Sequence, residues 1–184
     1  MKPLFTVHGG EYLVGSYIEQ NYKHVKVWVP AKDTGVDLLV TDRNSHRAIS
    51  LQVKFSKDYL ATDMGAEFQK NLRACGWWTI NRAKLRSSPA NFWVFVLLGF
   101  ERRSTDFIII PPKALLQRLE AIHGRRQNAI VQTYLWVTED KGCWETRGLG
   151  RKEQIRIAIG DYHEERRDLK KWLNVWTPVA RLNR

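Results

Sequence analysis

Cysteine is scarce in this sequence. Cys75 and Cys143 are the only two, they lie far apart, and neither belongs to a CxxC pair. The spacing therefore argues against a disulfide framework and against a structural zinc site. Two ordinary thiols are typical of a protein that works in a reducing cytoplasm.

Long apolar runs are also missing. The longest run, FWVFVLLGF at residues 92–100, is far too short to span a bilayer. The first residues, MKPLFTVHGGEY, contain no apolar segment like that of a signal peptide. We therefore expect a cytoplasmic protein with no membrane partner.

Several common catalytic motifs are absent as well. The sequence has no GxSxG nucleophile elbow and no HExxH pair, and its five histidines are scattered. GLGRK at residues 148–152 lacks the full spacing of a phosphate-binding P-loop, and the longer segment GCWETRGLGRK is expected to be a basic loop. No small-molecule cofactor is therefore expected.

Positive charge, in contrast, is in excess. Lys and Arg number 30 against 19 Asp and Glu, which gives a formal net charge of +11. Because each phosphate that a protein neutralises releases condensed counterions, this excess favours a nucleic-acid partner. The alternative is a structural or regulatory protein whose charge only keeps it in solution.

Length and composition indicate one domain over residues 1–184, with 43% hydrophobic and 27% charged residues. Apolar spacing and continuous apolar runs predict an α/β fold with a central mixed β-sheet flanked by helices, in which the most apolar strands are covered on both faces. The expected strands are 25–29, 36–41, 48–55, 92–100, 106–111 and 131–138, and the expected helices are 10–22, 64–86 (two helices broken near Gly76), 112–122 and 164–176.

Two of these strands carry polar residues in their middles. Asp37 stands in the apolar strand expected at 36–41, and Gln52 and Lys54 lie two residues apart in the strand expected at 48–55. Residues two apart on a strand share a face. If the strands pair as a hairpin, Asp37 approaches both. The alternative is a half-buried hairpin whose polar residues face solvent or hydrogen-bond within a turn.

Such a group of side chains has a chemical use. Carboxylate and carbonyl oxygens are ligands of Mg²⁺, which also binds phosphate, and Mn²⁺ takes the same ligands. A lysine beside them stabilises negative charge on a phosphate under attack. The expected metal ligands are Glu11 on the first helix, Asp37, Gln52 and the backbone carbonyl of Val53. Glu11 could instead be a first-turn acid favoured by the helix dipole, and Glu19 is the alternative acid on the same helix.

These residues resemble a known nuclease pattern. An early-helix glutamate, an aspartate on a strand and (Asp/Glu/Gln)-x-Lys on the next strand is similar to the PD-(D/E)xK pattern of the restriction-endonuclease-like superfamily, which includes archaeal-type Holliday junction resolvases. Glu11 matches the helix glutamate and Asp37 the strand aspartate. Gln52 matches the variable acid position and Lys54 the lysine. The resemblance covers about residues 8–57, with further strands and helices over 58–184, and it implies a restriction-endonuclease-like core.

The sequence departs from this pattern at two positions. Val36 stands where the motif has proline, and Gln52 replaces the usual acid. Glutamine there is similar to the QxK version of Mrr-like type IV restriction enzymes and of the endonuclease subunit of some heteromeric transposases. Because glutamine offers only a neutral oxygen, a catalytically weak or inactive DNA-binding subunit of the same fold is the alternative to an active nuclease.

The resemblance implies a Mg²⁺-dependent DNA endonuclease that acts in recombination, repair or DNA defence. Its catalytic residues would be Glu11, Asp37, Gln52 and Lys54. A homodimer is the expected assembly, because cutting two strands needs two active sites.

Further residues are candidates for contact with the DNA backbone. They follow the motif or lie on the helices expected over 64–86, where a solvated helix face is the alternative. Asp33, in contrast, is expected to be a turn residue. The candidates are Ser56, Lys57, Lys70, Arg73, Arg82 and Lys84.

Overall fold

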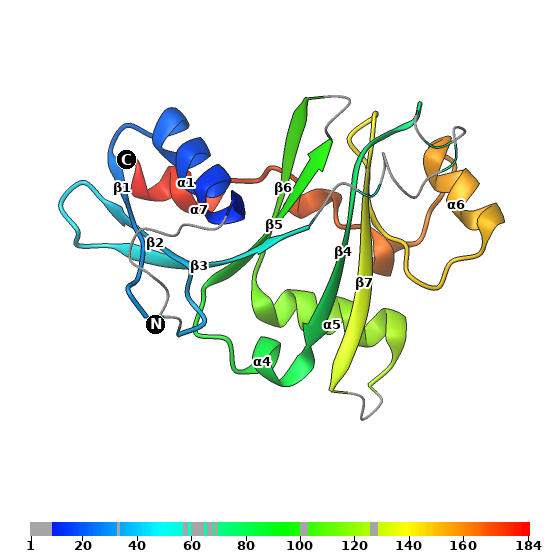
Figure 1. Cartoon of the computed structure of the whole chain (residues 1–184), viewed down its shortest axis with the longest axis horizontal. Helices are drawn as coiled ribbons and strands as arrows, with labels where there is room; N and C mark the ends of the chain where they lie inside the picture. The colour runs from blue at the N-terminus through cyan, green and yellow to red at the C-terminus, as the bar shows by residue number, and fades with distance from the viewer. Residues whose placement is uncertain are drawn as a thin grey trace.

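The computed structural model describes residues 9–32, 34–56, 59, 65, 68, 70–99, 103–125 and 129–184. They form an α/β protein with a five-strand mixed sheet, a three-strand antiparallel sheet and several helices (Figure 1). The expected α/β class is confirmed, and the second sheet was not expected. Among the described residues, no helix is long and apolar enough to cross a membrane.

The five-strand sheet has the order β1-β2-β3-β5-β6. Strands β1, β2 and β3 pair antiparallel, β5 runs parallel to β3, and β6 returns antiparallel to β5. All five strands fall where alternating or continuous apolar residues predict them. Their bounds are β1 Val25–Trp28, β2 Leu38–Asp42, β3 Ala48–Phe55, β5 Phe92–Gly99 and β6 Ser104–Ile110.

Helix α1 (Gly9–Asn21) and helix α7 (Thr177–Leu182) lie together on one face of this sheet (Figure 1). The apolar stripe expected on α1 is confirmed, because Val14 and Ile18 are fully buried and pack in one cluster with Leu51 of β3. Burying an aliphatic side chain of this size contributes roughly 1.5–3 kcal/mol. Helix α7 was not expected from the sequence.

The opposite face is covered by the second sheet and by helix α5, which starts at Pro112 as expected. Strand β5 contributes to both sides: Trp93 and Phe95 pack toward the second sheet, whereas Val94 and Val96 pack toward α1. This confirms that the apolar run is covered on both faces over its described residues, 92–99. The covering elements are β4 Leu72–Asn81, β7 Ile130–Thr138, β8 Cys143–Glu145 and α5 Pro112–His123.

The prediction of helices over 64–86 is wrong over residues 72–81 and is confirmed over residues 82–86. Residues 72–81 form strand β4, and the helix that follows is α4 (Arg82–Arg86). Residues 64, 66, 67 and 69 lie outside the described part of the chain. Strand β4 pairs with β7 along its whole length. Its aromatic side chains favour a strand, and this long-range pairing outweighs a spacing that also fits a helix.

The basic helix expected over 164–176 is also a wrong prediction. Two single turns of 3-10 helix stand there instead, η1 (Glu165–Arg167) and η2 (Lys170–Trp172). The guanidinium of Arg167 reaches the buried carboxylate of Glu145, with Nη1 2.8 Å from Oε2. A tertiary ion pair of this kind holds the charged segment against the second sheet. Helix α6 (Arg151–Ala158), which starts inside the segment expected to be a loop, was likewise not expected.

Glu164 ties this segment to its surroundings. Its Oε2 accepts the hydroxyl of Tyr162 at 2.5 Å, and its carboxylate also pairs with Arg166 and Arg167. The hydrogen bond from Tyr162 is the largest cause that lowers the pKa of Glu164 from its usual 4.5. Burial, together with the same hydrogen bond, raises the pKa of Tyr162 to about 12.

Tyr162→Phe should remove part of the acid dependence of stability. The lowered pKa of Glu164 contributes stability that is fully present above pH ~4.5 and is lost as the pH falls through the folded-state pKa. The variant lacks the main cause of that shift. The difference in unfolding free energy between wild type and variant should therefore shrink in acid. Urea denaturation at about pH 7 and about pH 3 measures it, and a constant difference would contradict this role.

Gly76 lies in β4 at a point where a side chain has no room. A Cβ placed there would be 2.3 Å from Cη2 of Trp78, a buried ring that meets Phe95 edge-on. Gly76→Ala should therefore lower the free energy of unfolding by about 1–3 kcal/mol, the range for overpacked cores, as measured by urea denaturation.

Gly15→Ala is the matched control. A Cβ at Gly15, in α1, would lie 3.7 Å from Cγ1 of Val27, which is an ordinary contact. Alanine is favoured over glycine inside a helix by roughly 0.5–1 kcal/mol, so this variant should be neutral or more stable. Equal destabilisation by both substitutions would show that crowding against the indole ring is not the cause.

Candidate metal and phosphodiester site

Asp37 stands where strand β2 begins. Its backbone N–H donates to the carbonyl of Leu51 at 2.8 Å, so the residue extends the pairing of β2 with β3 by one position. The residue is only 7% exposed. Its side chain therefore does not belong to a solvent-facing polar edge.

The Asp37 carboxylate binds two groups of β3. Its Oδ2 accepts the backbone N–H of Val53 at 2.7 Å and the side-chain N–H of Gln52 at 2.9 Å. The hairpin thus joins Asp37 to Gln52 as the strand pattern predicts. Hydrogen bonds to a carboxylate are stronger than those between neutral groups. One of these bonds also satisfies the backbone N–H of Val53, which lies on β3 past the position where β2 starts.

Lys54 lies two residues after Gln52 and so projects from the same face of β3. Its ammonium is 5.0 Å from the centroid of the Trp93 ring, within the range of a cation–π contact. Trp93 is itself held in place, because its indole N–H donates to the hydroxyl of Ser88 at 2.9 Å. Strand β5 therefore provides the surface on which the lysine lies.

Glu11 is in the first turn of α1 and is 5% exposed. Its neighbour Gly10 lies directly against β3, since a Cβ there would be 3.2 Å from Cγ1 of Val53. Helix α1 starts over the face of β3 that carries Val53, whereas Gln52 and Lys54 project from the other face. The fold therefore brings Glu11 to the strand that bears the site, from the opposite side of the sheet.

The oxygen donors suit a hard divalent cation on one condition. The set consists of the Asp37 carboxylate, the Gln52 amide oxygen and the Val53 carbonyl, all ligand types of Mg²⁺. In the structure Gln52 turns its Nε2 toward Asp37. A half-turn of the amide exchanges its nitrogen and oxygen and would place two oxygens side by side. Among the described residues, no three His, Cys, Asp and Glu side chains form a metal-holding group, so a site here depends on these amide and backbone oxygens.

The residues that follow the motif have mixed positions. Ser56 is buried, and its hydroxyl accepts the backbone N–H of Trp77 at 3.1 Å, which joins the end of β3 to β4. Lys57 and Asp33 lie outside the described residues. Glu19, the second helix acid, is exposed on α1.

The basic candidates for backbone contact do not form one group. Arg73 pairs with the buried Asp106, with Nε 3.2 Å from Oδ2. Arg82 is buried, and its Nη1 donates at 2.7 Å to the carbonyl of the residue that follows α5. Lys70 and Lys84 are exposed. Of these four, Arg73 and Arg82 both have structural contacts inside the protein.

Two residues that shape the site were not expected from the sequence. Trp93, whose ring meets Lys54, and Ser88, which holds that ring, come from a segment about 40 residues downstream of Gln52. The parallel pairing of β3 with β5 places Trp93 opposite Gln52. Apolar patterning marks both strands but does not give their register.

Comparison with protein-family models, curated proteins and solved structures finds no match to this chain. The similarity to the PD-(D/E)xK pattern accordingly remains a resemblance of short motifs. The functional interpretation rests on the residues and contacts described above.

Gln52→Glu tests whether this cluster takes a metal. A second carboxylate beside Asp37 replaces an N–H donor with a like charge, so without divalent metal the free energy of unfolding should fall by about 1–3 kcal/mol. A ligand of the folded state adds stability, so Mg²⁺ or Mn²⁺ should raise the Tm of the variant more than that of the wild type. Thermal unfolding with and without metal measures both effects.

Gln20→Glu is the matched control for this substitution. It makes the same chemical change at an exposed position of α1. Its Tm should respond to the metal as the wild type does. If Gln52→Glu gains no more from Mg²⁺ or Mn²⁺ than the control gains, the cluster is not a metal site.

Proposed function

We propose that the protein is a Mg²⁺-dependent DNA endonuclease that hydrolyses phosphodiester bonds, with a restriction-endonuclease-like core formed by α1, β1 to β3 and β5. The observation that carries the proposal is the pair of hydrogen bonds that Asp37 Oδ2 accepts from Gln52 and Val53. Gln52 stands two residues before Lys54, and Val53 stands one residue before it. Residues of two strands that match one pattern and then meet across a hairpin support a shared role. The proposed site residues are Asp37, Gln52 and Lys54, whereas Glu11, which the pattern also includes, lies on the opposite side of the sheet.

Each oxygen donor has a separate part in this proposal. A bound Mg²⁺ would polarise the scissile phosphate and make a bound water more acidic. Asp37 would supply the charged ligand, and Gln52 (with its amide turned) and the Val53 carbonyl would supply neutral ones. Because Gln52 brings no charge, such a site has one formal negative charge fewer than a site with an acid there, and it binds metal more weakly. Glu11 is the remaining carboxylate, on the helix side of β3.

Lys54 would act on the phosphate itself. An ammonium beside a phosphate oxygen stabilises the negative charge that grows there during attack. The side chain has a flexible four-carbon stem, and the Trp93 ring, 5.0 Å from the ammonium, restricts where the charge lies. Trp93 is therefore proposed as a positioning residue.

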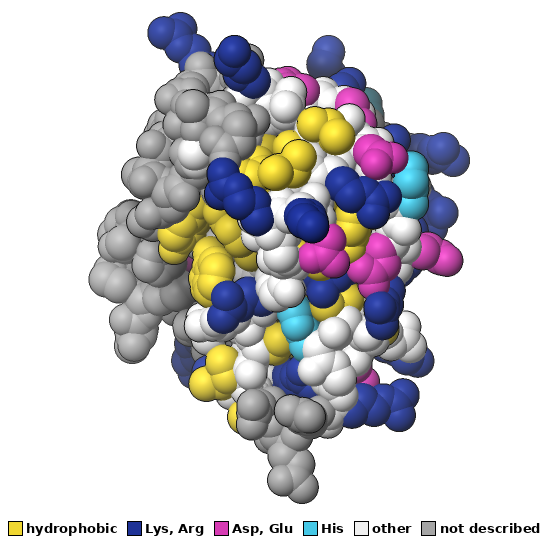
Figure 2. Space-filling model, turned by 90° about the vertical axis from the view of Figure 1, so that its right-hand side faces the viewer, with side chains coloured by type: hydrophobic (Ala, Val, Ile, Leu, Met, Phe, Trp, Pro, Cys, Tyr) yellow, Lys and Arg dark blue, Asp and Glu magenta, His cyan; other side chains and the backbone are white. Residues whose placement is uncertain are grey.

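The charge of the chain supports DNA as the substrate. Its net charge of +11 suits a polyanion, because neutralised phosphates release counterions. On the face shown in Figure 2, which carries α6 and β7, Lys and Arg side chains are spread over the surface with Asp and Glu among them. Acidic side chains interrupt the basic ones on this face, so the support for DNA comes from the net charge, and binding through it would be sensitive to salt.

A DNA-binding subunit that does not cleave is the second candidate. The observation that favours it is the hydrogen bond from the side-chain N–H of Gln52 to Oδ2 of Asp37. This hydrogen bond uses the carboxylate oxygen that a metal would bind. Turning the amide breaks a hydrogen bond to a charged group, which costs about 1.5–3 kcal/mol. That cost would lower the metal affinity of the folded protein by the same amount.

Cleavage of plasmid and branched DNA with Mg²⁺ or Mn²⁺ separates the two candidates. Asp37→Ala removes the charged oxygen and Lys54→Ala removes the ammonium, so each should lower the cleavage rate by about 100-fold or more, the usual effect of losing one charge-stabilising group. Lys152→Ala is the control, because it removes the same charge as Lys54→Ala from an exposed position of α6 and should leave the rate unchanged.

Each result of this experiment decides something, provided circular dichroism shows that the variants are folded. Equal cleavage by wild type and both site variants would contradict the proposed site. Salt-dependent DNA binding by a wild type that cleaves with neither metal would favour the non-cleaving subunit. No DNA binding at low salt would contradict both candidates and support a purely solubilising charge.

A further inference from the structure

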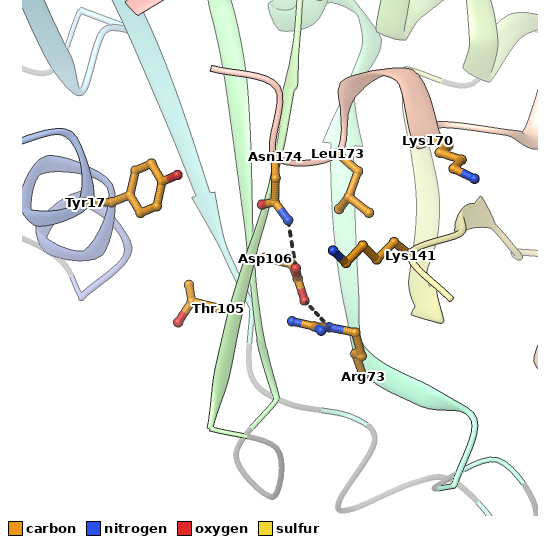
Figure 3. Close-up of a pocket in the computed structure, with 8 residues that line it drawn as sticks. All are labelled: Tyr17, Arg73, Thr105, Asp106, Lys141, Lys170, Leu173 and Asn174. Atoms are coloured by element: carbon orange, nitrogen blue, oxygen red, sulfur yellow. Dashed lines mark hydrogen bonds and ion pairs between the residues drawn. The ribbon is translucent and has the colours of Figure 1, made fainter. Parts of the chain in front are cut away.

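A pocket of about 510 Å³ lies beside the edge strand β6, and none of the residues that line it belongs to the proposed nuclease site (Figure 3). Five parts of the chain form it: helix α1, strand β4, strand β6, the turn after β7, and the segment that contains η2. Its volume is in the range of small-molecule sites. The residues that line it are Tyr17, Arg73, Thr105, Asp106, Lys141, Lys170, Leu173 and Asn174.

Asn174 builds one side of the pocket. Its backbone N–H donates to the carbonyl of Phe107 at 2.6 Å, and its side-chain oxygen accepts the N–H of Phe107 at 2.8 Å. The residue has a φ of 54°, a left-handed conformation that asparagine tolerates better than most residues. Its side-chain N–H donates to Oδ1 of Asp106 at 2.8 Å. These bonds fix the segment against the edge of β6.

Asp106 and Arg73 form the floor of the pocket. Asp106 is 3% exposed, and its Oδ2 lies 3.2 Å from Nε of Arg73. The carboxylate is thus satisfied by the guanidinium and by the amide of Asn174, and it holds both of them in place. Figure 3 shows the guanidinium pointing across the pocket toward Thr105.

Two lysines add positive charge to this side. Lys141 projects from the turn after β7 with its ammonium toward Asp106, as Figure 3 shows. Lys170 lies at the rim, and Figure 3 shows its ammonium directed away from Asp106 and Arg73. Its charge also acts on Asp140, whose pKa is lowered chiefly by a hydrogen bond from Thr138. Three cations against the single carboxylate of Asp106 leave the lining with two net positive charges.

The facing wall of the pocket is uncharged and rigid. The ring of Tyr17 stacks on Trp176 at a centroid distance of 5.0 Å and also contacts Phe107 at 5.0 Å. Figure 3 shows its hydroxyl pointing toward Asn174. Leu173 adds an apolar surface on the side nearer the lysines. The pocket therefore joins a cationic wall to an aromatic and apolar one.

We propose that this pocket binds the phosphate end of a nucleotide. The phosphate lies between Arg73 and Lys141, and the sugar and base lie along Tyr17 and Leu173. A phosphate monoester carries a charge of about −1.5 to −2 at pH 7, which the two net positive charges of the lining balance. The nucleotide is either free or the terminal unit of a DNA strand. The proposal uses none of the residues assigned to cleavage, so it stands or falls separately from the nuclease assignment.

Isothermal titration of the full chain with four compounds tests this proposal. They are inorganic phosphate, deoxyadenosine 5′-monophosphate, deoxyadenosine and a short 5′-phosphorylated oligodeoxynucleotide. The monophosphate should bind at least about tenfold more tightly than the nucleoside, because a charge-assisted hydrogen bond to the phosphate is worth that factor or more. Comparing the monophosphate with the oligodeoxynucleotide distinguishes a free nucleotide from a strand end.

Lys141→Asn and Lys170→Gln together remove the two lysine charges, and asparagine tolerates the left-handed backbone of Lys141, whose φ is 63°. The double variant should bind the monophosphate roughly tenfold or more weakly than the wild type. Lys113→Gln, an exposed lysine on α5, is the control and should bind as the wild type does. Unchanged binding by the double variant, equal binding of nucleoside and nucleotide, or no binding of any phosphate compound would overturn the proposal.

Discussion

The burial of β5 on both faces determines how the layers of this molecule are arranged. Val94 and Val96 are fully buried on the side of α1, and Phe95 is fully buried on the side of the second sheet. A strand with two apolar faces needs a cover on each of them. The chain provides α1 and α7 for one face and β4, β7 and α5 for the other (Figure 1). The second sheet is therefore the cover that an apolar central strand requires.

The same strand determines what lies beside the candidate site. Its register with β3 sets Trp93 opposite Gln52, and the Trp93 ring meets the ammonium of Lys54. Along the edge of β3 that faces β2, Asp37 accepts hydrogen bonds from the backbone N–H of Val53 and the side-chain amide of Gln52. Polar groups in buried strands are stable when they are hydrogen-bonded. Asp37 and Gln52 have such hydrogen bonds, and Lys54 has the contact with the Trp93 ring. A metal-bound state would exchange the Gln52 hydrogen bond for a metal–oxygen bond.

Local patterning predicted much of this fold and little of its long-range geometry. The five strands of the first sheet, α1 and α5 follow from apolar period, and so does the approach of Asp37 to Gln52, because a hairpin is a local structure. The helices expected over 64–86 and 164–176 failed where distant partners decide the conformation, namely the pairing with β7 and the ion pair of Arg167 with Glu145. The pocket beside β6 could not be predicted, since its walls come from five segments that are distant in the sequence.

The central claim is that Asp37, Gln52 and Val53 hold a divalent cation. Diffraction from crystals soaked in Mn²⁺, measured near the manganese absorption edge, would locate the ion directly. The claim predicts an anomalous peak bound to a carboxylate oxygen of Asp37 and to Oε1 of Gln52 after the amide has turned, at distances close to the roughly 2.0–2.1 Å of Mg²⁺–oxygen bonds. Peaks found only elsewhere, with the Gln52 N–H still on Asp37, would contradict it.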